Sequence, residues 1–132
     1  MPTRQKQVPS FKAQRRQLNF VLAVDCSGSM RGEKIKSLNY AMRIALPAMR
    51  LAAADNPEVG VFLRVLRVGS GVEWQQPHAV AIEDYEWSEL EAEGETSIGS
   101  ALSEIGDFLG PEQLPGRQLP PIVVLISDGP VS

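Results

Sequence analysis

Two short, almost uninterrupted apolar runs constrain the fold of this 132-residue chain, and each of them ends in an aspartate. The first run covers residues 18–24 and leads into Asp25, and the second covers 122–126 and leads into Ser127 and Asp128. Runs that are apolar at nearly every position are typical of parallel strands with both faces buried. We therefore expect two central strands whose carboxyl ends hold acidic side chains.

The chain between these runs alternates helical and extended patterns. Apolar residues recur every three or four positions from Glu33 to Ala52, which predicts a helix that Pro47 kinks or splits. The remaining patterns predict a strand at 59–68, short flanking strands at 72–74 and 79–82, and a second helix marked by Ile98, Leu102, Ile105 and Leu109. The tight turn at 69–71 indicates that the segment 72–74 pairs back antiparallel.

Strands that alternate with helices in this way predict an α/β fold. We expect a Rossmann-like, doubly wound and mostly parallel sheet with one antiparallel edge strand. In such folds ligands bind beyond the carboxyl ends of the strands. If the two aspartate-bearing strands lie side by side, Asp25 and Asp128 converge on one crevice.

Composition and charge argue against several classes of function. The net charge of −3, with basic residues concentrated in the N-terminal tail, does not favour nucleic-acid binding. We interpret residues 1–17 as a basic polar tail, solvated or in contact with an acidic partner, that precedes one domain at 18–132. No apolar run approaches the roughly 18 residues of a membrane span, and the N-terminus lacks a signal peptide pattern. Together with a single cysteine, Cys26, which we expect to be a buried filler, these features favour the cytoplasm.

The segment from Asp25 to Ser29 places side-chain oxygens at every second position. A tight turn at Gly28 can aim these oxygens inward together, because glycine tolerates backbone angles that other residues avoid. With Asp128 added, the set contains only carboxylate and hydroxyl oxygens. Such a set suits a hard cation, Mg²⁺ first, with Mn²⁺ and Ca²⁺ as the other candidates. Two carboxylates leave the ion under-neutralised, so one position should accept a carboxylate from outside.

Three parts of the sequence, in chain order, resemble the metal-ion-dependent adhesion site of von Willebrand factor type A domains. They are Asp25-x-Ser27-x-Ser29, the segment 94–98 around Thr96, and the segment 126–129 around Asp128. The sequence of residues 22–32 is most similar to that of the intracellular bacterial branch of the family, which includes tellurite-resistance-associated members. The resemblance covers about 18–132. It implies Ser27 and Ser29 as direct ligands, with Thr96, Asp25 and Asp128 binding directly or through water.

The residues alone leave two of these assignments open. Thr96 lies at the start of the second predicted helix, where a threonine hydroxyl often caps the helix instead. Asp25 has a cap of the helix at Glu33 as its alternative role, although it lies far upstream for that.

The resemblance implies a protein-binding module and no enzymatic activity. A partner's Asp or Glu would complete the coordination of the ion, and Arg31, Tyr85 and Trp87 would flank the site. The two aromatic residues either anchor the partner or cover the core. Partners such as kinases, phosphatases or ATPases of bacterial stress systems are implied.

The alternative function is a Mg²⁺-dependent phosphoryl-transfer enzyme that uses Asp25 as its nucleophile. No general base or lysine accompanies the acids in the sequence, and the one histidine, His78, lies in a polar stretch that predicts a surface loop.

Complete domains of the resembled family continue with two further strands and their helices after the Asp-Gly motif. The resemblance therefore implies a sheet truncated after its fourth strand, with the C-terminal part of the domain missing. The strand at 122–126 would then have a bare outer edge. We expect a fragment, a complementing chain that supplies the missing strands, or self-association at this edge.

Overall fold

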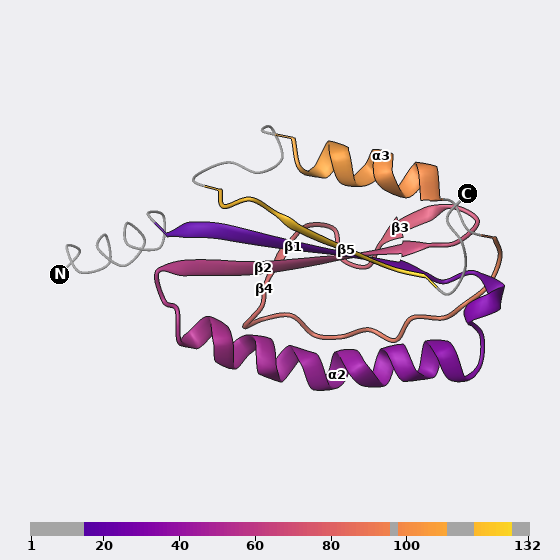
Figure 1. The fold of residues 1–132 in the computed structure, drawn as a ribbon, viewed down its shortest axis with the longest axis horizontal. Helices are drawn as coiled ribbons and strands as arrows, with labels where there is room; N and C mark the ends of the chain where they lie inside the picture. Colours follow the sequence, from indigo (N-terminus) through magenta and orange to yellow (C-terminus); the bar gives the residue numbers. More distant parts are fainter. Residues whose placement is uncertain (1–14, 96–97, 111–117, 128–132) are drawn as a thin grey trace.

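A computed structural model describes residues 15–95, 98–110 and 118–127 of the chain. Figure 1 shows an extended sheet with a long helix along one side and a shorter helix along the other. In chain order the elements are β1 (Arg16–Asp25), the single 3-10 turn η1 (Gly28–Met30), α2 (Glu33–Ala54), β2 (Val59–Val68), β3 (Val72–Trp74), β4 (Val80–Ala81), α3 (Ile98–Phe108) and β5 (Ile122–Ile126). The strand β1 starts at Arg16, so the end of the predicted tail belongs to the sheet.

The strands form one sheet in the order β3-β2-β1-β5, and β4 also pairs with β2. The central strand β1 is parallel to β2 on one side and to β5 on the other. Both β3 and β4 are antiparallel to β2, so two short strands in succession form the antiparallel edge where we expected one. The predicted α/β class and the predicted pairing of the two apolar runs are confirmed.

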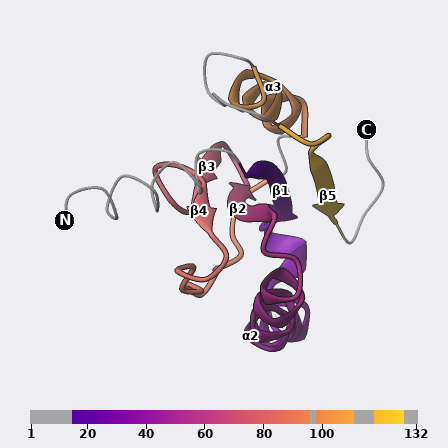
Figure 2. The same ribbon diagram turned by 90° about the vertical axis from the view of Figure 1, so that its left-hand side faces the viewer.

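The two helices cover opposite faces of the sheet, as Figure 2 shows. On the α2 side, Leu22 and Val24 of β1 share a buried cluster with Leu38 and Leu46 of the helix. On the α3 side, alternate residues of β1 pack in a second cluster with Ile105 and Phe108. Because successive strand residues point to opposite faces, β1 needs apolar residues at nearly every position, and this explains its uninterrupted pattern.

The helix α2 runs through Pro47 as one element of 22 residues. Of the two predicted outcomes at Pro47, a kink or a split, the split is therefore wrong. A proline inside a helix costs roughly 3 kcal/mol, because it removes one backbone hydrogen bond and crowds the preceding turn. Here Pro47 is exposed, and buried residues on both sides of it, Leu46 and Ala53, fix the helix against the sheet. Their packing offsets the loss.

Three of the four apolar residues that marked α3 in the sequence contact the core: Ile105 is buried in the α3-side cluster, and Ile98 and Leu109 pack against it. Ala101, Ile105 and Phe108 face the sheet, whereas the side chain of Leu102 is 61% exposed. Leu102 is thus the member of the four that faces solvent.

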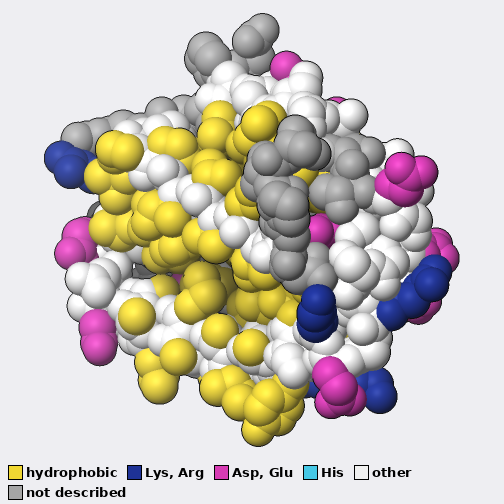
Figure 3. Space-filling model, turned by 45° about the vertical axis from the view of Figure 1, so that its right-hand side comes forward, with side chains coloured by type: hydrophobic (Ala, Val, Ile, Leu, Met, Phe, Trp, Pro, Cys, Tyr) yellow, Lys and Arg dark blue, Asp and Glu magenta, His cyan; other side chains and the backbone are white. Residues whose placement is uncertain are grey.

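The strand β5 is the least covered part of the sheet. In the described part of the chain, β1 is its only strand neighbour, and its residues Ile122, Val123, Val124 and Leu125 are 40–45% exposed. Figure 3 shows hydrophobic side chains gathered over a broad area of this side of the molecule. As expected, no strand in the described ranges pairs with the outer edge of β5. Among the described residues, no helix has the length and apolarity that a membrane span requires.

Candidate metal site

The carboxyl ends of β1 and β5 lie side by side. Val24 pairs with Ile126, and the next residue on each strand joins the contact, because the hydroxyl of Ser127 donates to Oδ2 of Asp25 at 2.9 Å. We expected the carboxyl ends of the two strands to lie together, and the structure confirms this up to Ser127, the last described residue. Asp128 and Thr96, two of the five predicted ligands, lie outside the described residues.

The carboxylate of Asp25 is buried and held in a fixed orientation. The residue is 2% exposed, its Oδ1 accepts the backbone N–H of Ser27 at 2.9 Å, and its Oδ2 accepts the Ser127 hydroxyl. A carboxylate oxygen carries two lone pairs, so it can accept a hydrogen bond and still coordinate an ion. Asp25 does not cap α2, whose N-cap residue is Gly32. The alternative role for Asp25 is thus excluded.

The turn η1 brings the two predicted serine ligands together. Ser27 is buried and Ser29 is exposed, and their hydroxyl oxygens lie 3.1 Å apart. The backbone N–H of Met30 donates to the carbonyl of Ser27 at 2.9 Å, which closes the turn. The pair therefore extends from the buried end of β1 to the surface.

The donor set fits a hard cation. Hydroxyl pairs that only hydrogen-bond to each other usually approach to about 2.7–2.8 Å. Neighbouring ligands of an octahedral Mg²⁺ ion, with metal–oxygen distances of about 2.1 Å, are about 3.0 Å apart. The Ser27 and Ser29 oxygens, 3.1 Å apart, form a hydrogen bond and are also close enough to coordinate one ion together. Among the described residues, no three His, Cys, Asp or Glu side chains form a metal cluster, so the chemistry here is that of hydroxyls beside a carboxylate.

Sequence reasoning missed a second wall of this site. The backbone N–H of Glu93 donates to the carbonyl of Cys26 at 2.7 Å, and the N–H of Gly28 donates to the carbonyl of Gly94 at 2.8 Å. These two bonds lie on either side of Ser27. The one hint in the sequence was the glycine at position 94. In the structure Gly94 has a φ of 82°, and an added Cβ would lie 2.2 Å from the Ser70 hydroxyl oxygen.

The three predicted partner-binding residues have different environments. Arg31 is exposed, and its Nε–H donates to the carbonyl of Ala92 at 3.2 Å. Tyr85 is fully buried in the α2-side cluster, and its hydroxyl donates to Gln75, so its prediction as a surface anchor is wrong. Trp87 is partly buried, and its indole N–H donates to Oδ1 of Asn39 at 2.9 Å. The ring of Tyr85 covers the core, which was the alternative left open for both aromatic residues.

Cys26 is buried inside the site loop, as expected of a filler. Burial is the main cause that raises the pKa of its thiol to about 11, and the neighbouring Asp25 adds to the effect. Arg67 and a backbone bond to Val68 act in the opposite direction. At neutral pH the thiol is therefore protonated, which is not the state that binds metals or attacks electrophiles. His78 is exposed in its loop, as predicted.

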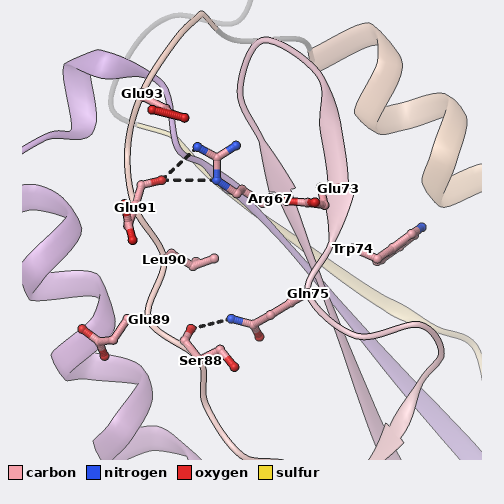
Figure 4. A pocket seen from close by; sticks show the side chains of 9 residues that line it. All are labelled: Arg67, Glu73, Trp74, Gln75, Ser88, Glu89, Leu90, Glu91 and Glu93. Atoms are coloured by element: carbon pink, nitrogen blue, oxygen red, sulfur yellow. Dashed lines mark hydrogen bonds between the residues drawn. The ribbon is translucent and has the colours of Figure 1, made fainter.

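A pocket of about 460 Å³ lies beside the second wall of the site, and Figure 4 shows its lining. Four glutamates, Glu73, Glu89, Glu91 and Glu93, contribute to it. The guanidinium of Arg67 spans the pocket and donates through Nε and an NH2 group to the carbonyl of Glu91, at 3.2 and 3.0 Å. The abundance of glutamates makes this pocket unsuitable for the acidic side chain of a partner.

The comparisons with known proteins are sparse. No protein-family model matches the chain, and no curated protein matches it significantly. Among solved structures, the chain is similar to a von Willebrand factor type A protein from Catenulispora acidiphila, with 20% sequence identity and a TM-score of 0.49. The match covers 70% of this chain and 22% of that protein's chain.

Proposed function

We propose that this chain is a metal-dependent protein-interaction module of the von Willebrand factor type A kind. Asp25, Ser27, Ser29, Thr96 and Asp128 would hold a Mg²⁺-type ion, and a partner would bind through an Asp or Glu side chain. When bound, the ion would supply a Lewis-acidic position for that carboxylate. The finer expectations, a bacterial cytoplasmic protein of the stress-response branch, belong to the same proposal.

One observation supports the proposal most strongly. A buried, oriented carboxylate, that of Asp25, and two hydroxyls 3.1 Å apart lie at the carboxyl end of the central strand. This is the place where α/β folds bind their ligands. Burying a carboxylate is costly, so a purely structural role would be better served by a neutral residue.

The residues would divide the work according to their exposure. Asp25 is held at depth by the N–H of Ser27 and the hydroxyl of Ser127, so it contributes charge without needing to move. Ser29 is exposed and stands nearest to an incoming partner. The exposed guanidinium of Arg31 lies at the same rim and favours the approach of an acidic side chain.

Binding of Mn²⁺ to the full chain, followed by electron paramagnetic resonance, tests this proposal. The wild-type chain should take up one equivalent, Asp25→Asn should lose most of this uptake, and Ser37→Ala, at an exposed position of α2, should behave like the wild type. Acetate should then lower the water-proton relaxation enhancement of the bound Mn²⁺, because a carboxylate displaces coordinated water. Uptake that Asp25→Asn leaves unchanged would contradict the proposal.

A phosphatase assay separates this proposal from the phosphoryl-transfer alternative. With Mg²⁺ and p-nitrophenyl phosphate, the interaction module should give no turnover above the buffer rate. Turnover that disappears in Asp25→Asn would favour the enzyme instead.

A further inference from the structure

Residues 90–94, here called the strap, belong to no helix or strand, yet each of them is hydrogen-bonded to a different residue elsewhere in the chain. The carbonyl of Glu91 accepts from Arg67 and that of Ala92 accepts from Arg31. The last two residues, Glu93 and Gly94, bond to the backbone of Cys26 and Gly28. The strap thus links the body of the domain to the loop that holds the predicted serine ligands.

The first residue of the strap, Leu90, is held by a single buried side chain of α2. Asn39 is 4% exposed, and its Oδ1 accepts the N–H of Leu90 at 2.9 Å while its Nδ2 donates to the carbonyl of Leu90 at 3.0 Å. The same side chain also accepts from Trp87 and donates to the carbonyl of Ile35 in its own helix. All four hydrogen-bonding positions of the amide are therefore used.

The far end of the strap fixes the position of Ser27. The bonds to Cys26 and Gly28 are short, 2.7 and 2.8 Å, and they flank this serine on both sides. A shift of the strap would therefore move the backbone of the loop and alter the 3.1 Å separation of the Ser27 and Ser29 hydroxyls.

We propose that Asn39 is a positioning residue for the candidate metal site and acts through the strap. This inference rests on the proposed function. Without the amide, the N–H and the carbonyl of the buried Leu90 lose their side-chain partners, and unsatisfied polar groups are costly enough to move a segment that has no ladder of its own. Arg67 and Arg31 hold only the middle of the strap, and both are at least partly exposed.

The test compares two variants of the full chain. Asn39→Leu keeps a side chain of similar size and removes all four hydrogen bonds. Ile105→Ala lies in the cluster on the opposite face of the sheet, under α3, and serves as the control for general loss of stability. For each variant we would measure the melting temperature, the Mn²⁺ dissociation constant, and amide hydrogen exchange at Gly28 and Glu93.

Asn39→Leu should weaken Mn²⁺ binding about ten- to a hundredfold, as loss of outer-shell support does at other metal sites. It should also speed exchange at Gly28 and Glu93, whereas Ile105→Ala should lower the melting temperature and leave the dissociation constant unchanged. If the leucine variant does not fold, Asn39→Asp, which keeps an acceptor oxygen and replaces the donating amide nitrogen with a second oxygen, should weaken binding in the same direction.

Three results would overturn the inference. A folded Asn39 variant that binds Mn²⁺ like the wild type would do so, and so would an Ile105→Ala variant that loses as much affinity for the same loss of melting temperature. A wild-type chain that takes up no Mn²⁺ would overturn the proposed function and, with it, the role of Asn39 in metal binding. The exchange rates distinguish the last case, because they report the coupling of Asn39 to the loop without any metal.

Discussion

The hydroxyl oxygens of Ser27 and Ser29 lie 3.1 Å apart across one short turn, the first buried with its residue and the second open to solvent. The expected dependence of this turn on glycine is wrong, because Gly28 has no positive φ and an added Cβ would meet its nearest atoms at 3.7 Å. The strap fixes the backbone on both sides of Ser27. The local sequence pattern provides the two hydroxyl oxygens, and the strap, distant in the sequence, holds the backbone that positions them.

The first prediction concerns stabilisation by Mg²⁺. A ligand that binds only the folded state at about 100 times its dissociation constant stabilises that state by about 2.7 kcal/mol. Mg²⁺ should therefore raise the melting temperature of the wild-type chain by several degrees, and a chelator should reverse the shift. Ser29→Ala should reduce the shift with little effect on the metal-free melting temperature, because the Ser29 side chain is exposed. Equal shifts in both proteins would argue against Ser29 as a ligand.

The second prediction concerns Gly94. Its φ of 82° disfavours any residue with a Cβ, and an added Cβ would lie 2.2 Å from the Ser70 hydroxyl oxygen. Gly94→Ala should lower the free energy of unfolding by about 1–3 kcal/mol, measured by urea denaturation. Adding Ser70→Gly should restore only part of this loss, because it removes the clash and leaves the strained backbone.

Gly106→Ala is the matched control for Gly94→Ala. Gly106 lies inside α3, and nothing lies within 4 Å of the position that its Cβ would take. Alanine should therefore stabilise the chain there, by up to about 1 kcal/mol. A Gly94→Ala variant as stable as Gly106→Ala would show that the strap does not require the conformation described above.

Sequence patterns predicted the elements that have their own periodicity. Residues 59–68 form β2 as expected, and the helix that starts at Glu33 ends at Ala54, directly before the predicted stop at Asp55. Patterns failed where distant side chains decide the outcome, as at Pro47, where the packing of its neighbours keeps the helix whole. The strap shows no apolar periodicity that would reveal it in the sequence. It is held in place by side chains of α2 and β2, Asn39 and Arg67.

The same limit applies to the candidate site. Acidic residues at strand ends and alternating hydroxyls can be recognised in a sequence, and this pattern favours a hard-cation site. The roles of Asp25, Ser27 and Ser29 as ligands are implied by the family resemblance. The hydrogen bonds that fix Ser27 join residues 26 and 28 to residues 93 and 94, and no local pattern encodes such a contact.

The third prediction concerns alkaline pH and Tyr85. Burial raises the pKa of this phenol above its ordinary value of 10.0, so the folded state retains a proton that the unfolded state loses. Stability should therefore fall as the pH rises above about 10, the range in which an unfolded tyrosine ionises. Arg50 lies close but donates to the backbone carbonyls of Ile82 and Tyr85, and not to the phenol.

Tyr85→Phe isolates this contribution from that of Cys26, whose pKa is also raised by burial. The variant should be less stable at neutral pH, because it loses the hydrogen bond to Gln75, and the difference from the wild type should shrink as the pH rises. Urea denaturation at several pH values measures this. A difference that stays constant up to pH values well above 10 would contradict a buried, protonated Tyr85.

The last prediction concerns the outer edge of β5. Residues 122–126 contain no charge and no proline, the devices that keep exposed edge strands from pairing with other chains, and four of them are 40–45% exposed. The chain should therefore self-associate as its concentration rises, in light scattering coupled to size exclusion. Val124→Lys should suppress this association, because a lysine in the middle of the strand must be dehydrated when another strand pairs there.

Leu102→Lys, at a 61% exposed position of α3, places the same charge on a different apolar site and should leave the association unchanged. Equal suppression by both variants would point to a general effect of added charge, and a wild-type chain that stays monomeric throughout would show that the β5 edge does not self-associate.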